Sequence, residues 1–261
     1  AYENDGNVGR APLPAGVSWE EAQQTNTDWI DELTQTGIKQ MYAVSGGYKG
    51  DNWGAYFNIT HDNNESYLQD NKYVRNSARL NLDWEPIPKL KTNVSSSFVR
   101  GINHRVYNGW AGGLGAALST ALPIYTIYDS TGEYDLSHVN PVAVLNLLDW
   151  KTFESRSINS FSIEYKFNPK LKLKGFVGID YSKLTDDVHE DGTLLFVDHA
   201  GNAVRDVQLN TTQTYNMVGT YKVLDNHIHR FNVLVGVERI QANDGFQSFF
   251  EDSMSTAFYE N

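Results

Sequence analysis

The sequence predicts an all-β fold in which antiparallel strands form a segment of a transmembrane β-barrel. Three observations lead to this prediction: apolar and polar residues alternate with a period of two, short and long connections alternate between strands, and aromatic residues lie near strand ends. A period of two is typical of strands with one apolar and one polar face. In a barrel that crosses a membrane, the apolar face contacts lipid and the polar face lines the interior.

The alternation is clearest between residues 74 and 98, where Val74, Ala78, Leu80 and Leu82 share one face of an extended segment. A membrane strand needs roughly 9 to 11 tilted residues, and segments of about this length recur along the chain. In pairs, they predict about eight strands: 41–48 and 53–61, 74–83 and 90–100, 158–167 and 171–182, and 215–221 and 231–237.

The connections between these segments differ in length in a regular order. Short links fall at 49–52, 84–89, 168–170 and 223–227, and the long links between them run over 62–72, 101–155 and 183–209. Outer-membrane barrels have short periplasmic turns and longer extracellular loops. We therefore expect the short links to face the periplasm and the long ones to face outward.

Aromatic residues near the strand ends fit the two girdles that amphipathic rings form at membrane interfaces. Aromatic residues are also common in strands of any kind, so both interpretations stay open. The residues concerned are Tyr42, Tyr48, Tyr73, Trp84, Tyr181 and Tyr221.

Composition excludes several classes of function. The chain has no cysteine, so disulfides, thiolate metal sites and cysteine nucleophiles are excluded. Its formal net charge of −11 argues against nucleic acid as a partner. No nucleophile, base and orienting group occur at a recognisable spacing, so we predict no catalytic residues, no cofactor and no enzymatic activity. No apolar run reaches the roughly 20 residues of a spanning helix.

Three regions are expected along the chain: a loop with a short helix at 1–38, a barrel segment at 39–240 and a truncated extracellular loop at 241–261. Ser18 to Glu21 has the pattern of a capping box, and Asn26 or Thr27 could cap a short helix that runs through Leu33. The first residues lack the features of a signal peptide. We therefore expect the sequence to be a fragment of a longer chain or a split piece.

Several motifs, in their order and spacing, resemble the early barrel of SusC/RagA-type TonB-dependent outer-membrane transporters. The resemblance covers most of Asn26 to Arg239. It rests on Asn26 to Trp29, Val44 to Gly47, Arg79 to Asp83, Leu122 to Tyr125 with Asp129 and Gly132, Asn140 to Ala143, Leu173 to Tyr181 and Val233 to Glu238.

The resemblance implies a barrel of about 22 strands in the Gram-negative outer membrane, of which this chain would supply about eight. It also implies import of oligosaccharides or peptides with a SusD-like surface lipoprotein, driven by the TonB complex through segments that match no residues here. Two alternatives stay open: a structural or docking barrel of a larger envelope or secretion complex without uptake, and an independent eight-stranded barrel.

The long link at 101–155 is where the resemblance places ligand capture. We name Tyr107, Trp110, Tyr125 and Tyr128 as candidate substrate-binding residues, because exposed aromatic rings can stack on the apolar face of a sugar. Long loops also need hydrophobic residues for their own packing, and this interpretation is the more frequent one.

Two clusters contain residue types that can bind metals, but we assign no metal to either. His227 and His229 lie at i and i+2, but no third ligand is evident. Asp186, Asp187 and Asp191, with Glu190, could offer oxygen ligands to calcium, although a solvated acidic loop is the simpler interpretation.

Overall fold

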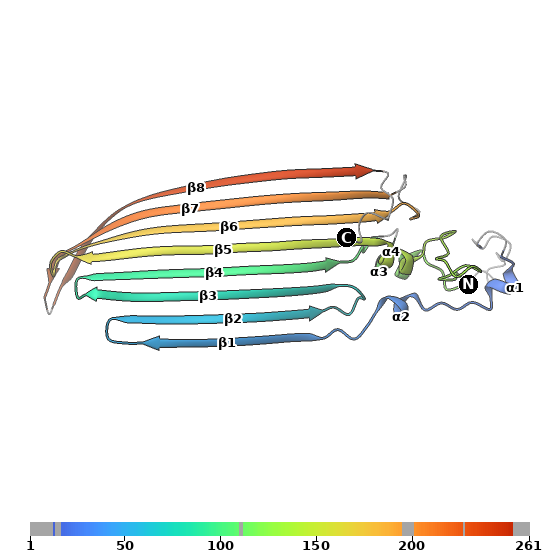
Figure 1. Cartoon of the computed structure of the whole chain (residues 1–261), viewed down its shortest axis with the longest axis horizontal. Coiled ribbons are helices and arrows are strands. Elements are labelled where there is room, and N and C mark those ends of the chain that lie inside the picture. Colours follow the sequence, from blue (N-terminus) through green and yellow to red (C-terminus); the bar gives the residue numbers. More distant parts are fainter. Residues whose placement is uncertain (1–12, 14–16, 110–111, 195–200, 227, 253–261) are drawn as a thin grey trace.

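The alternating segments form eight antiparallel strands that pair in sequence order within one sheet, which confirms the predicted all-β fold (Figure 1). The structure is a computed structural model and describes residues 13, 17–109, 112–194, 201–226 and 228–252. The strands are β1 (Lys39–Lys49), β2 (Trp53–Glu65), β3 (Lys72–Ile87), β4 (Leu90–Arg105), β5 (Leu148–Lys166), β6 (Leu171–Asp191), β7 (Gly201–Asp225) and β8 (Arg230–Asp252).

The connections alternate between the two ends of the sheet. Four short turns, between β1 and β2, β3 and β4, β5 and β6, and β7 and β8, lie within or beside the predicted links. The predicted 84–89 and 223–227 links are partly strand, since β3 runs to Ile87 and β7 runs to Asp225. At the other end, the link between β4 and β5 is the long one and carries the helices α3 (Gly113–Ser119) and α4 (Pro141–Leu147) (Figure 1). We call these two ends the turn end and the loop end.

Two segments expected as loops are largely strand. β6 continues to Asp191 and β7 begins at Gly201, so most of the predicted 183–209 link is paired. Likewise, β8 runs on to Asp252 and pairs with β7 through all of 241–252, the start of the predicted final loop. Both faces are polar in much of these extensions, so alternation does not mark them. The division of the chain into functional regions stays a prediction.

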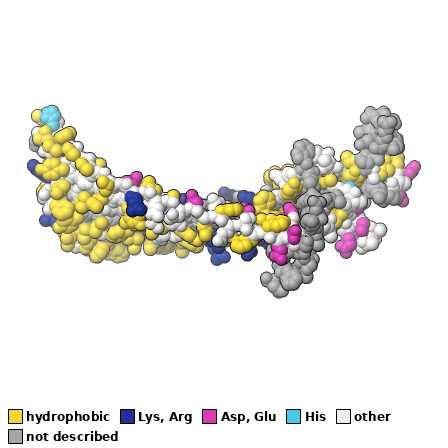
Figure 2. Space-filling model, turned by 90° about the horizontal axis from the view of Figure 1, so that it is seen from above, with side chains coloured by type: hydrophobic (Ala, Val, Ile, Leu, Met, Phe, Trp, Pro, Cys, Tyr) yellow, Lys and Arg dark blue, Asp and Glu magenta, His cyan; other side chains and the backbone are white. Residues whose placement is uncertain are grey.

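The two faces of the sheet differ in composition. Cross-strand register places Leu82, Val94, Phe161, Val177 and Tyr215 in one row on the same face, which we call the outward face. Figure 2 shows hydrophobic side chains gathered along the convex side of the sheet toward the turn end. On β4, the apolar stretch from Leu90 to Phe98 corresponds to roughly 27 Å along the strand. At a strand tilt of about 45° this stretch covers roughly 19 Å of membrane depth, which is most of a membrane-facing band about 25 Å tall.

Large aromatic side chains border this band at the turn end. Trp53 and Trp84 are directly paired on the outward face, and the ring of Tyr48 lies 4.6 Å from that of Trp53. Tyr73 was grouped with such residues from the sequence, but its place in the register puts it on the opposite, inner face. There its hydroxyl donates a 3.1 Å hydrogen bond to Glu154 Oε2, so it does not belong to an interfacial girdle.

Short helices precede the sheet. Helix α1 (Trp19–Ala22) begins at Ser18 with the predicted capping box. Helix α2 (Trp29–Leu33) begins at Asp28 and not at Asn26 or Thr27, because the Asp28 carboxylate accepts hydrogen bonds from the N–H groups of Ile30 and Asp31. No helix within the described ranges combines the length and hydrophobicity needed to cross a membrane.

Candidate functional site

The inner face of the sheet forms a polar wall joined by cross-strand hydrogen bonds. Arg156 donates to both carboxylate oxygens of Asp180, at 3.0 and 2.6 Å. Nearer the turn end, Ser162 Oγ donates to Asn93 Oδ1 at 3.2 Å. Bonds of this kind hold polar side chains flat against the wall and leave a hydrophilic surface past which a polar ligand could move.

Toward the loop end, the inner face becomes acidic. Glu154 accepts from the Tyr73 hydroxyl, Asp186 accepts from the Thr152 hydroxyl, and Asp206 accepts from the Ser248 hydroxyl at 2.5 Å. These three carboxylates lie on β5, β6 and β7, so the rim of the wall carries negative charge on adjacent strands.

A small folded unit, which we call the loop module, sits at the loop end and consists of residues 27–34 and 112–147. Its core contains the buried side chains of Trp29, Leu33, Ala121, Tyr125 and Val142. Helices α2, α3 and α4 contact one another within it. Because α2 immediately precedes β1 and the other helices lie between β4 and β5, the module joins segments that are distant in sequence.

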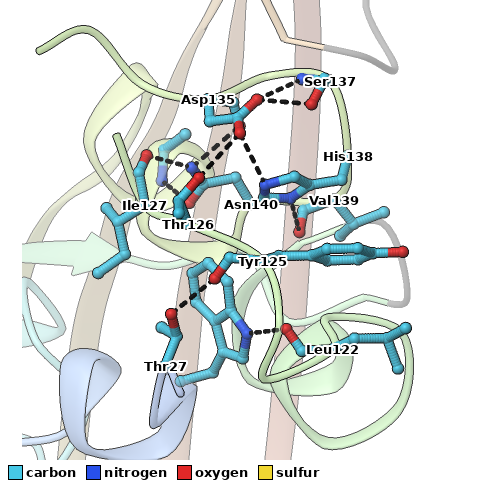
Figure 3. Close-up of polar contacts among 12 residues, drawn as sticks. Thr27, Leu122, Tyr125, Thr126, Ile127, Asp135, Ser137, His138, Val139 and Asn140 are labelled. Atoms are coloured by element: carbon cyan, nitrogen blue, oxygen red, sulfur yellow. Dashed lines mark hydrogen bonds and ion pairs between the residues drawn. The ribbon is translucent and has the colours of Figure 1, made fainter. Parts of the chain in front are cut away.

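Three hydrogen bonds, two from side chains and one from the backbone, attach the segment before β1 to the long loop. The Thr27 hydroxyl donates to the Tyr125 carbonyl oxygen at 2.6 Å, and Trp29 Nε1 donates to the Leu122 carbonyl oxygen at 2.9 Å (Figure 3). Thr27 N–H also donates to the Pro123 carbonyl oxygen at 2.8 Å. The motif from Leu122 to Tyr125 therefore has a structural role, since its backbone receives the N-terminal segment.

A buried histidine lies at the centre of the module. The His138 ring stacks on Tyr125 with 4.3 Å between centroids, and its Nε2 lies 3.3 Å from Asp135 Oδ2 (Figure 3). Asn140 caps α4 by accepting from Ala143 N–H at 3.1 Å, and its amide donates to the Ile127 carbonyl oxygen at 2.8 Å. These polar contacts fix the path of residues 126–140 over the core.

Acid is expected to loosen the loop module. Burial alone would raise the pKa of Asp135, but hydrogen bonds from the Ser137 and Thr126 hydroxyls and the Ser137 N–H, with His138 nearby, lower it on balance. The Thr131 hydroxyl and N–H, with further backbone N–H groups, also lower the pKa of Asp129. Carboxyls with lowered pKa values stabilise the fold above their unfolded pKa of about 3.9, and this stability is lost as pH falls through the folded pKa values.

Limited proteolysis between about pH 5 and pH 2 checks this expectation. Cleavage within 112–147 should rise as the pH falls below about 4. Asp135→Asn should weaken this pH dependence, whereas Asp51→Asn in the exposed β1–β2 turn should keep the wild-type profile. If Asp135→Asn left the pH profile of cleavage unchanged, Asp135 would not be a source of the acid sensitivity of the loop module.

The three candidate ligand residues that the structure describes, Tyr107, Tyr125 and Tyr128, do not come together on one surface. Tyr125 is 7% exposed and belongs to the core of the module, and Tyr107 packs against the second buried cluster, that of Val144, Leu148 and Leu194. Tyr128 is 52% exposed, and its ring stacks on Tyr134 at 5.3 Å. Trp110 lies outside the described residues. Tyr134 was not among the candidates predicted from the sequence. Its position six residues after Tyr128, across a turn at Gly132, could have indicated that the two rings stack.

The acidic cluster weighed as a calcium site is part of strand β6 and not a loop. Consecutive strand residues point to opposite faces, so Asp186 bonds Thr152 on the inner face while Asp187 pairs with Arg205 at 2.6 Å on the outward face. Among the described residues, no group of three or more His, Asp or Glu side chains is placed to hold a metal ion. His227 lies outside these residues.

A meander of strands with one apolar band and one polar wall, short turns at one end and a folded loop at the other, defines a segment of an outer-membrane barrel wall. Comparisons agree with this class. No family model matches the chain. It is 27% identical to the TonB-dependent receptor SusC of Bacteroides thetaiotaomicron over 188 residues, which is 61% of this chain and 18% of that protein.

The TonB-dependent receptor P26 of Formosa agariphila is also 27% identical, over 90% of this chain and 24% of that receptor. The chain thus spans about a fifth to a quarter of these curated relatives. Among solved structures, the RagAB peptide importer in its closed-closed state superposes with a TM-score of 0.72 at 15% identity, over 89% of this chain and 28% of that one. A second RagAB peptide transporter structure gives the same TM-score at 16% identity. The chain is thus similar to part of SusC and to part of a RagAB transporter, in agreement with the resemblance of its motifs.

Proposed function

We propose that this chain forms part of the barrel wall of a TonB-dependent importer in the Gram-negative outer membrane. The observation that carries the proposal is the two-faced sheet: an apolar outward band is suited to lipid, and a hydrogen-bonded polar inner wall is suited to an aqueous passage. In this orientation the short turns face the periplasm, and the loop module faces outward.

The cargo we propose is a large nutrient, either an oligosaccharide or a peptide. The likeness to SusC and to a peptide importer supports this class of cargo. We further propose a SusD-like surface lipoprotein as the partner at the loop end and the TonB complex as the source of energy. The acidic rim formed by Glu154, Asp186 and Asp206 favours cargo that offers hydroxyl or N–H donors.

Growth of a deletion strain tests the proposal. Cells that lack the gene should lose growth on one class of oligosaccharide or peptide as sole nutrient, and should regain it with the wild-type gene only when TonB is active. Membrane fractionation provides the control for location. A protein that is embedded in the outer membrane, but whose loss affects no uptake, would instead support a structural or docking barrel.

Within this proposal, Tyr128 is the candidate residue best placed to meet cargo. Removing its ring with Tyr128→Ala should weaken cargo binding by about 2- to 10-fold, because aromatic contacts contribute roughly 0.5–1.5 kcal/mol. Tyr128→Phe keeps the ring and should bind nearly as well as the wild type. Calorimetry with the cargo identified by growth measures both variants, and equal affinity for Tyr128→Ala and the wild type would remove Tyr128 from the site.

A further inference from the structure

The outward face carries basic side chains directly beyond its apolar band. Arg100 follows Phe98 at the next outward position of β4, and Lys183 follows Tyr181 in the same way on β6. In the register, Arg100 is opposite Ser155 of β5, and Ser155 is opposite Lys183. The two cations therefore flank Ser155 on the same face. Figure 2 shows Lys and Arg side chains on the convex side, between the hydrophobic area and the loop end.

These side chains line one concave surface. A groove of about 580 Å³ is lined by Arg100, Lys183 and Arg205 together with the apolar side chains of Phe98, Phe153 and Val207. The groove thus combines positive charge with hydrophobic walls, and it opens on the side of the sheet that faces away from the proposed passage.

Part of the charge in the groove is already neutralised. Arg205 makes two hydrogen bonds to the carboxylate of Asp187, at 2.6 and 2.7 Å. Glu154 accepts a hydrogen bond from Tyr73 on the inner face. In the part of the chain that the structure describes, neither Arg100 nor Lys183 has a hydrogen-bonded or ion-paired partner, and both side chains are exposed. A net positive charge remains at the centre of the groove.

We propose that Arg100 and Lys183 form a binding site for the phosphate of a membrane lipid, with Ser155 between them. Their backbones are two strands apart, or roughly 10 Å, a distance across which two long side chains can converge on one phosphate. A guanidinium can donate two parallel hydrogen bonds to phosphate, an ammonium adds a point charge, and the Ser155 hydroxyl can donate a further bond. The acyl chains of the lipid would then lie along the apolar band.

The depth of the site supports this occupant. Counted from the turn that precedes each strand, Arg100 is the eleventh residue of β4 and Lys183 the thirteenth of β6. At roughly 3.4 Å per residue and a strand tilt of about 45°, both lie about 25 to 30 Å above the turns, which is the height of the apolar band of such barrels. Headgroup phosphates are found at that level, and basic side chains there attract them.

This inference depends on the proposed membrane location but not on import. The test uses the full protein extracted from outer membranes in mild detergent, with native mass spectrometry as the readout. Monophosphoryl lipid A is added as the probe, and its dephosphorylated form and inorganic phosphate are added in parallel. The R100A/K183A double variant should retain at least about tenfold less phosphorylated lipid than the wild type. R75A/R79A, which removes two exposed arginines from the inner face, should retain it fully.

Equal retention of lipid by R100A/K183A and the wild type would overturn the site while leaving the proposed function intact. Equal retention of the dephosphorylated lipid, or displacement of the lipid by inorganic phosphate at the same concentration, would also overturn it. The exchanged variant R100K/K183R keeps both charges and should keep the lipid, which separates loss of charge from misfolding. Failure of the wild-type chain to partition into the membrane fraction would instead contradict the proposed function.

Discussion

Trp29→Ala should destabilise the loop module by about 3–5 kcal/mol, the range for removing a large aromatic side chain from a core. Trp29 is 3% exposed and lies at the centre of the module. Its indole N–H also donates to the Leu122 carbonyl oxygen at 2.9 Å, so the substitution leaves a cavity and removes one of the two hydrogen bonds that this oxygen accepts, the other coming from the Tyr125 N–H. The strands should persist, because their pairing does not involve this side chain.

Hydrogen exchange measured by mass spectrometry can separate the two parts. Amides in 112–147 should lose protection in Trp29→Ala, while those of β3 to β6 keep it. The matched control is Ile30→Ala, which removes an exposed side chain from the next position of the same helix and should cost less than about 0.5 kcal/mol. Unchanged protection of the loop in Trp29→Ala would mean that the module does not depend on α2.

Val94→Arg should destabilise the membrane-inserted protein by about 2–4 kcal/mol, the cost of an arginine on the lipid-facing side of a barrel near the bilayer midplane. Val94 lies on the outward face of β4, midway along its apolar stretch, opposite Leu82 on one side and Phe161 on the other. A guanidinium at this position would have no acidic neighbour in its row and would face hydrocarbon.

Ser160→Arg provides the matched control on the inner face. Ser160 lies on the adjacent strand between Ser95 and Gly178, whose small size leaves room for the longer side chain. Denaturant unfolding in lipid vesicles, followed by tryptophan fluorescence, compares the two variants. Ser160→Arg should stay within about 1 kcal/mol of the wild type, because its side chain reaches water. An equal loss in both variants would contradict the assignment of the faces.

The membrane-level part of the fold could be predicted because lipid on one side and water on the other impose alternation on every strand. Leu80 and Leu82 alternate with Arg79 and Asn81 for this reason, and the predicted strands and turns there are confirmed. Beyond the band both faces meet water, so this signal disappears. The consecutive residues Asp186 and Asp187 in β6 illustrate this loss of alternation, because both are polar although they lie on opposite faces. The sequence accordingly predicts a loop where the structure has strands.

The loop end was less predictable because its contacts join residues that are far apart in the sequence. Nothing local in the sequence shows that the Trp29 indole reaches the carbonyl of Leu122, or that Tyr125 packs in the same buried cluster as Trp29. Asn followed by Pro is a common helix start, so the pattern at Asn140 could have indicated α4, which was not predicted. It does not show that the same Asn140 side chain also bonds Ile127.

The short turns do not lie in one row of paired residues: from β1 to β8 they shift steadily along the strands. Lys49 lies beside the first turn, and the row of directly paired residues that starts there reaches Asn216 on β7. The last turn follows Asp225, which is nine residues further along β7. Nine residues correspond to roughly 30 Å, and the six strand spacings between these turns to roughly 29 Å. If the turns lie at one level, the strands are inclined by about 45°, a slope usual for closed barrels. Directly opposed residues on adjacent strands then differ in membrane depth by about 3 Å, so each row climbs toward the cell exterior from β1 to β8.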